Sequence, residues 1–275
     1  QRLVRSLCGL VLGDDKTYLV ETRLESIVRT HRCASFGGYL ARLRTSHEVR
    51  MRDELVECLT TGETSFNRDP HVFEDIRRRL IPLLAERLQR RKAMGYTSPL
   101  ARIWSAGCST GQEPYSLAMA MQDFLIENPG QGLRWEQFPI LATDISQRSL
   151  QTAHEGLYPL RELERGVTAV QRARYFRPDG ENWRVQESLK RMIEFRRLNF
   201  LDPVISFGTF DLICCRNVMI YFDMEVRQRL CDQFYRLLNP GGLLVLGTAE
   251  SLYGMSTPLE PVLLGAMAAY TRNGE

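Results

Sequence analysis

The stretch that decides the fold spans residues 101–119 and reads ARIWSAGCSTGQEPYSLAM. Ile103–Ala106 is a short apolar run, which predicts a buried strand. Gly107 and Gly111 follow it, and a helical spacing of apolar residues begins around Glu113. Glycines let a backbone approach a ligand closely, and a helix start carries free N–H groups. This strand, turn and helix start therefore predict a nucleotide-type cradle.

Alternating patterns continue from this stretch to the C-terminus. Further strands are expected at Phe138–Thr143, Ile193–Leu198, Phe210–Cys215 and Leu243–Gly247. Helical spacing separates most of them, as in Glu113–Glu127 and Met224–Leu238. Strands that alternate with helices are typical of a doubly wound, largely parallel α/β sheet. The apolar run at 262–272 predicts a final antiparallel strand or hairpin.

Other parts of the chain depart from this alternation. Residues 1–61 show helical spacing without a strand pattern, and they predict an all-helical domain. A polar joint and a connecting helix then occupy residues 62–99, and the α/β domain follows at 100–275. The alternation breaks between His154 and Arg191, where a helical stretch is expected first and the turn signal Pro178-Asp179-Gly180 follows within about 170–192. This break predicts a small β subdomain outside the main sheet.

Composition argues against several classes of protein. With 44% hydrophobic and 25% charged residues, the chain is typical of a soluble globular protein, and no apolar run could span a bilayer. The net charge of +3 is dispersed, so we expect no nucleic-acid partner and no membrane insertion. Seven cysteines without CxxC spacing and four scattered histidines predict no metal site and a reducing, cytoplasmic setting. Cys214 and Cys215 could form a redox pair, but buried strand thiols fit their apolar surroundings better.

The charges around the cradle indicate which ligand it holds. The nicotinamide fingerprint GxGxxG is absent, because three residues separate Gly107 from Gly111. Asp144, after the second strand, is the expected clamp for ribose hydroxyls. Glu113 stands where a pyrophosphate would lie, and a carboxylate there repels phosphate but suits a cation. These charges favour S-adenosylmethionine, which carries a sulfonium and an ammonium group, over NAD. The alternative is that Glu113 only stabilises the helix dipole.

Motifs along the whole chain are shared with one known family. They are Thr60-Thr61-x-x-Thr64-x-Phe66-x-Arg68, the run WSAGCSTGQEPYS at 104–116, Ala142-Thr143-Asp144, Leu198-Asn199, the run CRNVMIYFD at 215–223, and Leu238-Asn239-Pro240-Gly241-Gly242. In this order they resemble the bacterial chemotaxis receptor methyltransferases, the CheR family. The resemblance implies a class I S-adenosylmethionine-dependent methyltransferase fold. That fold is a Rossmann-like doubly wound sheet with an antiparallel last strand, a small β subdomain insert and an N-terminal all-helical domain.

The resemblance also implies an activity and the residues that carry it. The family transfers the methyl group of S-adenosylmethionine to glutamate side chains on the cytoplasmic helical domain of chemoreceptors. The products are γ-glutamyl methyl esters and S-adenosylhomocysteine. Arg68 and Tyr221 match the residues beside the transferred methyl group, although Tyr221 could instead be an aromatic ring packed at a strand end. The positions expected to contact the cofactor, with Gly107 of the cradle, are Thr64, Arg68, Glu113, Asp144, Asn199, Phe200, Cys215 and Arg216.

Two positions depart from the family pattern. Gly62 stands where members commonly carry Asn, so any cofactor contact there is expected to come from the backbone. Asn67 stands where Phe is common, which predicts a more polar pocket wall. Both changes bear on cofactor affinity more than on the identity of the reaction.

The expected partner is the acidic helical bundle of a chemoreceptor. The basic residues that could face it are Lys16, Arg23, Arg29 and Arg32, unless they form an ordinary solvated helix face. Some members grip a receptor C-terminal pentapeptide through a longer glycine-rich loop in the β subdomain. The compact loop Arg177–Asn182 predicts no such tethering here. We expect a monomer.

Three other functions remain at this stage. A non-catalytic adaptor that binds S-adenosylmethionine or S-adenosylhomocysteine would keep the pocket and act by binding receptors. Arg68 and Tyr221 argue against it, whereas Gly62 and Asn67 leave it open. A nicotinamide oxidoreductase is opposed by the glycine spacing and Glu113. A nucleic-acid methyltransferase is opposed by the lack of an NPPY-like motif and of a basic stripe.

Overall fold

Helices make up the N-terminal part of the molecule in the computed structural model, which describes residues 1–11, 13, 17–45 and 49–274. They are α1 (Arg2–Cys8), α2 (Thr17–Thr30), α3 (Phe36–Thr45) and α4 (Val49–Leu59). Tyr39, Leu43 and Met51 lie in a core that these helices share and that is separate from the core of the sheet. The expected all-helical character is confirmed, whereas the domain division at residue 61 stays a prediction.

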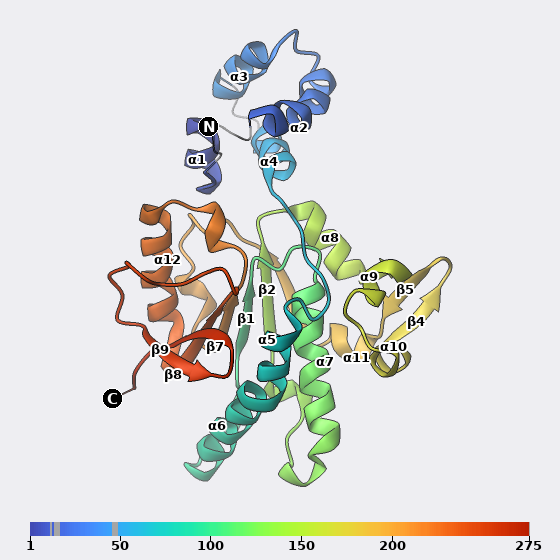
Figure 1. Ribbon diagram of the computed structural model, residues 1–275, viewed down its shortest axis with the longest axis vertical. Helices are drawn as coiled ribbons and strands as arrows, with labels where there is room; N and C mark the ends of the chain where they lie inside the picture. The colour runs from blue at the N-terminus through green and yellow to red at the C-terminus, as the bar shows by residue number, and fades with distance from the viewer. Residues whose placement is uncertain (12, 14–16, 46–48, 275) are drawn as a thin grey trace.

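A seven-stranded sheet forms the body of the molecule (Figure 1). Its strand order is β6-β2-β1-β7-β8-β10-β9. The strands are β1 (Ile103–Ala106), β2 (Ile140–Asp144), β6 (Ile193–Arg197), β7 (Phe210–Cys215), β8 (Leu238–Leu246), β9 (Glu260–Leu264) and β10 (Met267–Thr271). The first five pair in parallel, and β10 is antiparallel to both β8 and β9. The doubly wound sheet and its antiparallel C-terminal strand are therefore confirmed.

Helices cover both faces of this sheet. On one face lie α5 (Pro70–Asp75), the π turn η2 (Ile76–Leu80), α6 (Ile81–Ala93), α7 (Gln112–Glu127) and α8 (Gln147–Glu155). On the other face lies α12 (Met224–Leu237). Because neighbouring strand residues point to opposite faces, Cys214 packs on the α7 side and Cys215 on the α12 side. Both thiols are free and buried, and burial raises their pKa, which confirms buried strand thiols over a redox pair.

The β subdomain projects from the side of the sheet (Figure 1). It contains β3 (Leu157–Pro159), β4 (Phe176–Asp179) and β5 (Asn182–Val185), ordered β3-β5-β4, with α9 (Leu160–Glu164), α10 (Ala169–Tyr175) and α11 (Glu187–Lys190) around them. The strand β3 precedes the range of 170–192 expected from sequence. Gly156, with a φ of 59°, ends α8 and turns the chain into β3. Four short 3-10 turns complete the described elements: η3 (Pro129–Gln131), η4 (Trp135–Gln137), η5 (Ile205–Phe207) and η6 (Met219–Tyr221).

Candidate functional site

Residues at the carboxyl ends of β1, β2 and β7 line a pocket. Figure 1 shows the N-terminal helices above these strands. In this sheet β1 lies between β2 and β7, and ligands of such folds bind where the strand order reverses. The residues 60–69, called the joint segment below, run along the pocket. The predicted residues that line it are Thr64, Arg68, Gly107, Glu113, Asp144, Asn199, Phe200, Arg216 and Tyr221. Cys215 is not among the lining residues, because its side chain is buried in the core beneath α12.

The two glycines of the cradle have different tasks. Gly107 lines the pocket with a φ of 83°, and a Cβ there would lie 2.5 Å from Cγ2 of Val218. Gly111 also has a positive φ, of 95°, but its Cβ would meet Ala153 at 2.8 Å, outside the pocket. Of these two glycines, Gly107 lines the pocket, whereas Gly111 lets α7 begin close to α8.

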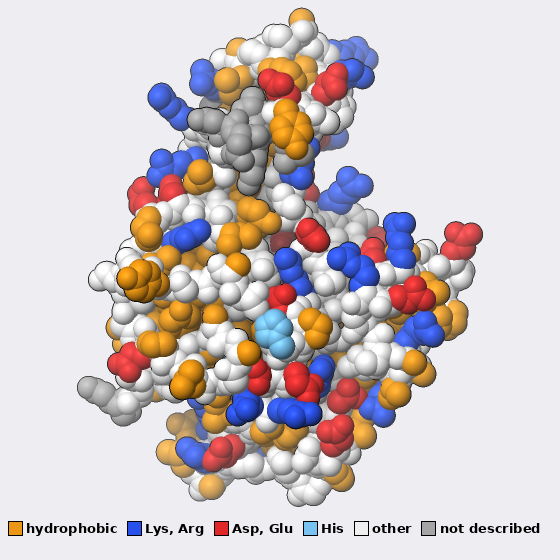
Figure 2. Space-filling view, viewed as in Figure 1, with side chains coloured by type: hydrophobic (Ala, Val, Ile, Leu, Met, Phe, Trp, Pro, Cys, Tyr) orange, Lys and Arg blue, Asp and Glu red, His pale blue; other side chains and the backbone are white. Residues whose placement is uncertain are grey.

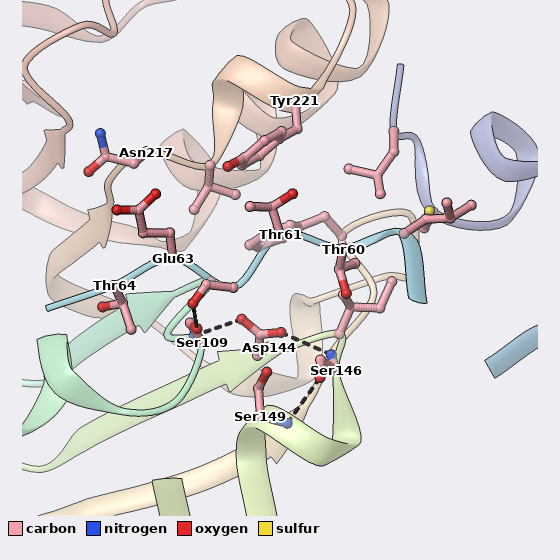
Figure 3. A pocket seen from close by; sticks show the side chains of 18 of the residues that line it. Thr60, Thr61, Glu63, Thr64, Ser109, Asp144, Ser146, Ser149, Asn217 and Tyr221 are labelled. Carbon is pink, nitrogen blue, oxygen red and sulfur yellow. Dashed lines mark hydrogen bonds between the residues drawn. The ribbon is translucent and has the colours of Figure 1, made fainter. Parts of the chain in front are cut away.

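Asp144 is held at the pocket floor by backbone donors. The N–H of Ser109 donates to its Oδ2 at 2.8 Å, and the N–H of Ser146 donates to its Oδ1 at 2.9 Å (Figure 3). Burial raises the pKa of Asp144, and these two donors oppose the shift. Ser109 also donates its hydroxyl to the carbonyl of Gly62 at 2.7 Å, which ties the joint segment to the cradle.

Glu113 reaches from the start of α7 to the end of β7. Its Oε1 accepts from the Ser105 hydroxyl at 2.8 Å, and its Oε2 accepts from Arg216 at 3.1 Å. Burial raises the pKa of Glu113, while the Arg216 guanidinium acts against that shift. A residue that only stabilised the helix dipole would not need these side-chain partners.

Arg216 links the sheet to the joint segment. Its guanidinium donates to the carbonyl of Arg68 at 2.7 Å and to Oδ2 of Asp69 at 2.9 Å, and its side chain is only 1% exposed. The Arg68 guanidinium donates to the carbonyl of Glu63 at 2.9 Å and lines the pocket. Arg216 thus fixes the backbone from which Arg68 extends.

Tyr221 enters the pocket from the side opposite Asp144 in the view of Figure 3. It ends the turn η6, and its carbonyl accepts from the N–H of Val11 at 2.9 Å. An antiparallel bridge between Leu10 and Phe222 lies beside this bond. The Tyr221 ring therefore lines the cavity, and the N-terminal segment helps to hold its backbone.

Two family descriptions match the chain. "CheR methyltransferase, all-alpha domain" matches residues 1–60, and "CheR methyltransferase, SAM binding domain" matches residues 62–264. The chain belongs to the CheR methyltransferase family. It is an S-adenosylmethionine-dependent methyltransferase.

Named CheR relatives cover most of the chain. A chemotaxis protein methyltransferase of Pseudomonas aeruginosa is 40% identical over 89% of this chain and 86% of its own length. One from Vibrio parahaemolyticus is 36% identical over 95% of this chain and 90% of its own length. The chemotaxis protein methyltransferase of Escherichia coli is 37% identical over 91% of this chain and 82% of its own length.

One departure from the CheR pattern has a different consequence from the one expected. Asn67 does not line the pocket, so the expectation of a more polar wall is wrong. Its Nδ2 donates to the carbonyl of Gly166 at 2.8 Å, so the side chain points toward the β subdomain. The φ of Asn67 is 48°, in the left-handed region, which Asn tolerates better than most residues do. Gly62 does line the pocket, and a Cβ there would lie 3.0 Å from Oγ of Ser109.

Arg23, expected on a receptor-facing surface, instead faces the pocket of this CheR protein. Its guanidinium donates to the carbonyl of Leu59 at 3.3 Å and to Oγ1 of Thr61 at 3.4 Å. Arg29 is exposed and pairs with Glu25. Arg32 is exposed. Lys16 lies outside the described residues.

Sequence reasoning missed other lining residues. Asn217 and Val218 could have been found, since they belong to the same motif as Tyr221. Thr60, Thr61 and Ser109 likewise belong to quoted motifs. The remaining ones depend on how distant segments fold over the cradle, and they include Cys8, Leu10, Val11, Ser146 and Ser149. No group of three or more potential His, Cys, Asp or Glu ligands forms a metal site within the described part of the chain.

Proposed function

We propose that this enzyme methylates glutamate side chains in the cytoplasmic helical region of chemoreceptors, forming γ-glutamyl methyl esters. One observation carries the proposal: Arg68 and Tyr221 line the same pocket as Glu113 and Asp144. A site with both cofactor-type carboxylates and groups that can meet a substrate suits catalysis rather than a non-catalytic adaptor. The names of the relatives, all chemotaxis protein methyltransferases, support a receptor as substrate.

The pocket's acceptors fit S-adenosylmethionine. Glu113 and Asp144 are carboxylates, and Oδ1 of Asn217 is a buried acceptor without a hydrogen-bond partner. Such acceptors complement ammonium, sulfonium and hydroxyl groups. When bound, S-adenosylmethionine supplies a methyl group on a positively charged sulfur. We propose that Glu113, Asp144 and Asn217 hold this cofactor, together with the predicted Thr64, Gly107, Asn199 and Phe200.

The substrate's glutamate carboxylate acts as the nucleophile, and the pocket residues have to orient it. A glutamate side chain, with an ordinary pKa of about 4.3, is ionised near neutrality, so no general base is required. The Arg68 guanidinium can orient the incoming carboxylate through a fork of two hydrogen bonds, which Lys cannot reproduce. Tyr221 can donate a hydrogen bond or close the wall against water. Such positioning can supply on the order of 7–11 kcal/mol of the barrier reduction.

The deciding experiment measures transfer of labelled methyl groups to receptor-containing membranes. We expect base-labile label, as methyl esters give, with the wild-type enzyme. Arg68→Ala should lower transfer by about 10²-fold or more, because the carboxylate loses its orienting partner. Arg236→Ala, which removes an exposed arginine at the end of α12, is the matched control and should transfer normally. Cofactor binding without transfer to any receptor would contradict the proposed substrate.

We further propose the setting in which the enzyme works. Arg29 and Arg32 approach the acidic face of the receptor bundle, and the enzyme acts as a monomer in the cytoplasm. Figure 2 shows acidic and basic side chains interspersed over one face of the molecule, which argues against a nucleic-acid surface there. Within the described residues, no helix has both the length and the apolar character to cross a membrane.

A further inference from the structure

Glu250 binds four backbone N–H groups with one carboxylate. Its Oε2 accepts from Asn217 at 2.6 Å and from Gly247 at 2.8 Å. Its Oε1 accepts from Val218 at 2.9 Å and from Ile220 at 3.2 Å. The residue is only 7% exposed, and it is not among the residues that line the pocket. Three of the four donors, Asn217, Val218 and Ile220, belong to the segment that follows β7, and the fourth, Gly247, follows β8.

That loop leads directly into Tyr221. Asn217 has a φ of 58°, and neither it nor Val218 belongs to a helix or strand. Backbone N–H groups in such a loop need partners from elsewhere, and a carboxylate is a strong acceptor for them. The N–H of Tyr221 in turn donates to the carbonyl of Val218 at 3.2 Å. The position of the Tyr221 backbone thus depends on a segment held by Glu250.

We infer that Glu250 is a positioning residue for methyl transfer, which sets the position of Tyr221 by clamping residues 217–220. This inference rests on the proposed role of Tyr221. Gly247 supports it, because a Cβ there would lie 2.7 Å from Oε2 of Glu250 and 2.8 Å from the nitrogen of Asn217. Glycine at 247 lets the carboxylate approach the loop closely.

Two variants disturb the clamp from opposite sides. Glu250→Gln keeps the shape of the side chain but turns an NH₂ group toward two of the four N–H donors. Gly247→Ala leaves the carboxylate intact and places a methyl group between it and Asn217. We expect both to lower kcat by about tenfold to 10²-fold, since a misplacement of ~1 Å can cost that much. The affinity for S-adenosylhomocysteine, measured by calorimetry, should fall by a smaller factor than kcat.

A buried carboxylate elsewhere provides the control for general destabilisation. Asp211 lies at the opposite end of β7 from the pocket, is 1% exposed, and accepts from the N–H of Arg102 at 3.0 Å. Asp211→Asn should lower the melting temperature without lowering kcat. If Asp211→Asn lowers kcat as much as Glu250→Gln at equal loss of stability, Glu250 has only a structural role and the inference is wrong.

A double-mutant cycle separates the clamp from the proposed function. In a Tyr221→Ala background, Glu250→Gln should lower kcat little further, because the ring it positions is gone. Reductions that multiply would overturn the inference. Normal kcat in Glu250→Gln beside impaired Tyr221→Ala would also overturn it, while leaving the role of Tyr221 intact. Normal kcat in Tyr221→Ala itself would overturn that role, and the inference with it.

Discussion

Burial and the ion pair with Arg216 shift the pKa of Glu113 in opposite directions. Burial raises its pKa, so the group takes up a proton at a higher pH than an exposed glutamate does. A cationic cofactor is attracted by the ionised form only. As the pH falls through the raised pKa, the affinity for S-adenosylmethionine should therefore fall as well, and calorimetry at a series of pH values measures this.

The variant Glu113→Gln tests the same point. It should weaken S-adenosylmethionine binding at neutral pH by about tenfold or more, because a charged partner is lost. It should also flatten the dependence of the affinity on pH. Glu86→Gln, at an exposed pair with Arg90, is the control and should bind normally. An unchanged pH profile in Glu113→Gln would show that another group controls it.

At the scale of residues, the sequence predicted well which residues share the pocket. It predicted less well the direction in which each side chain points. Glu113 lies in the pocket because α7 begins just after β1, and Arg68 lies there because the joint segment runs along the pocket. Cys215 and Asn67 do not, because the direction of a side chain depends on strand parity and on local φ. Neither property can be deduced from a motif alone.

At the scale of elements, the joint segment packs against the β subdomain, and this contact helps to position Arg68. A Cβ on Gly166 would lie 1.9 Å from the carbonyl oxygen of Phe66. Gly166→Ala should therefore push the two segments apart and destabilise the protein by about 1–3 kcal/mol. Because Thr64 and Arg68 flank Phe66, cofactor affinity should fall too. Denaturant unfolding and calorimetry measure the two effects.

Gly130→Ala is the matched control for that variant. Gly130 lies in the turn η3, and a Cβ there would meet no atom within 4 Å. We expect nearly unchanged stability and cofactor affinity. Equal losses in both variants would argue against a specific contact at Gly166.

Among the elements, the sheet strands were the most predictable. Ile103–Ala106 and Phe210–Cys215 match their predicted bounds, because both are short buried runs. β3 was not predicted, since a strand of three residues is too short to show an alternation of apolar and polar side chains. β8 begins at Leu238, earlier than expected, because a register shift beside Phe210 extends its pairing.

The charge of the N-terminal helices matters at the scale of the whole molecule. If Arg29 and Arg32 steer the encounter with an acidic receptor, Arg29→Glu with Arg32→Glu should raise KM for receptor and leave kcat nearly unchanged. Higher salt should reduce the difference, because it screens exposed charges. Arg236→Glu, elsewhere on the surface, is the control. A change in kcat at constant KM would place these residues in another step.

The β subdomain bears on how the whole enzyme reaches its substrate. Its β4–β5 connection is compact, with only Gly180 and Glu181 between the two strands. We therefore expect no micromolar binding of a receptor C-terminal pentapeptide, which calorimetry with the free peptide tests. Measurable binding in that range would show that a short connection suffices for tethering.

The sequence by itself determined the sheet, the cradle at 101–119 and the family, because these depend on local spacing and on the order of motifs. The tertiary structure alone decided which distant groups meet. Arg216 bonds to the carbonyl of Arg68 across 148 positions, and Glu250 holds Asn217 across 33. Such contacts depend on how the joint segment and the loops pack over the strand ends. No periodicity in the chain encodes that packing, so the support behind Arg68 and Tyr221 became visible only in three dimensions.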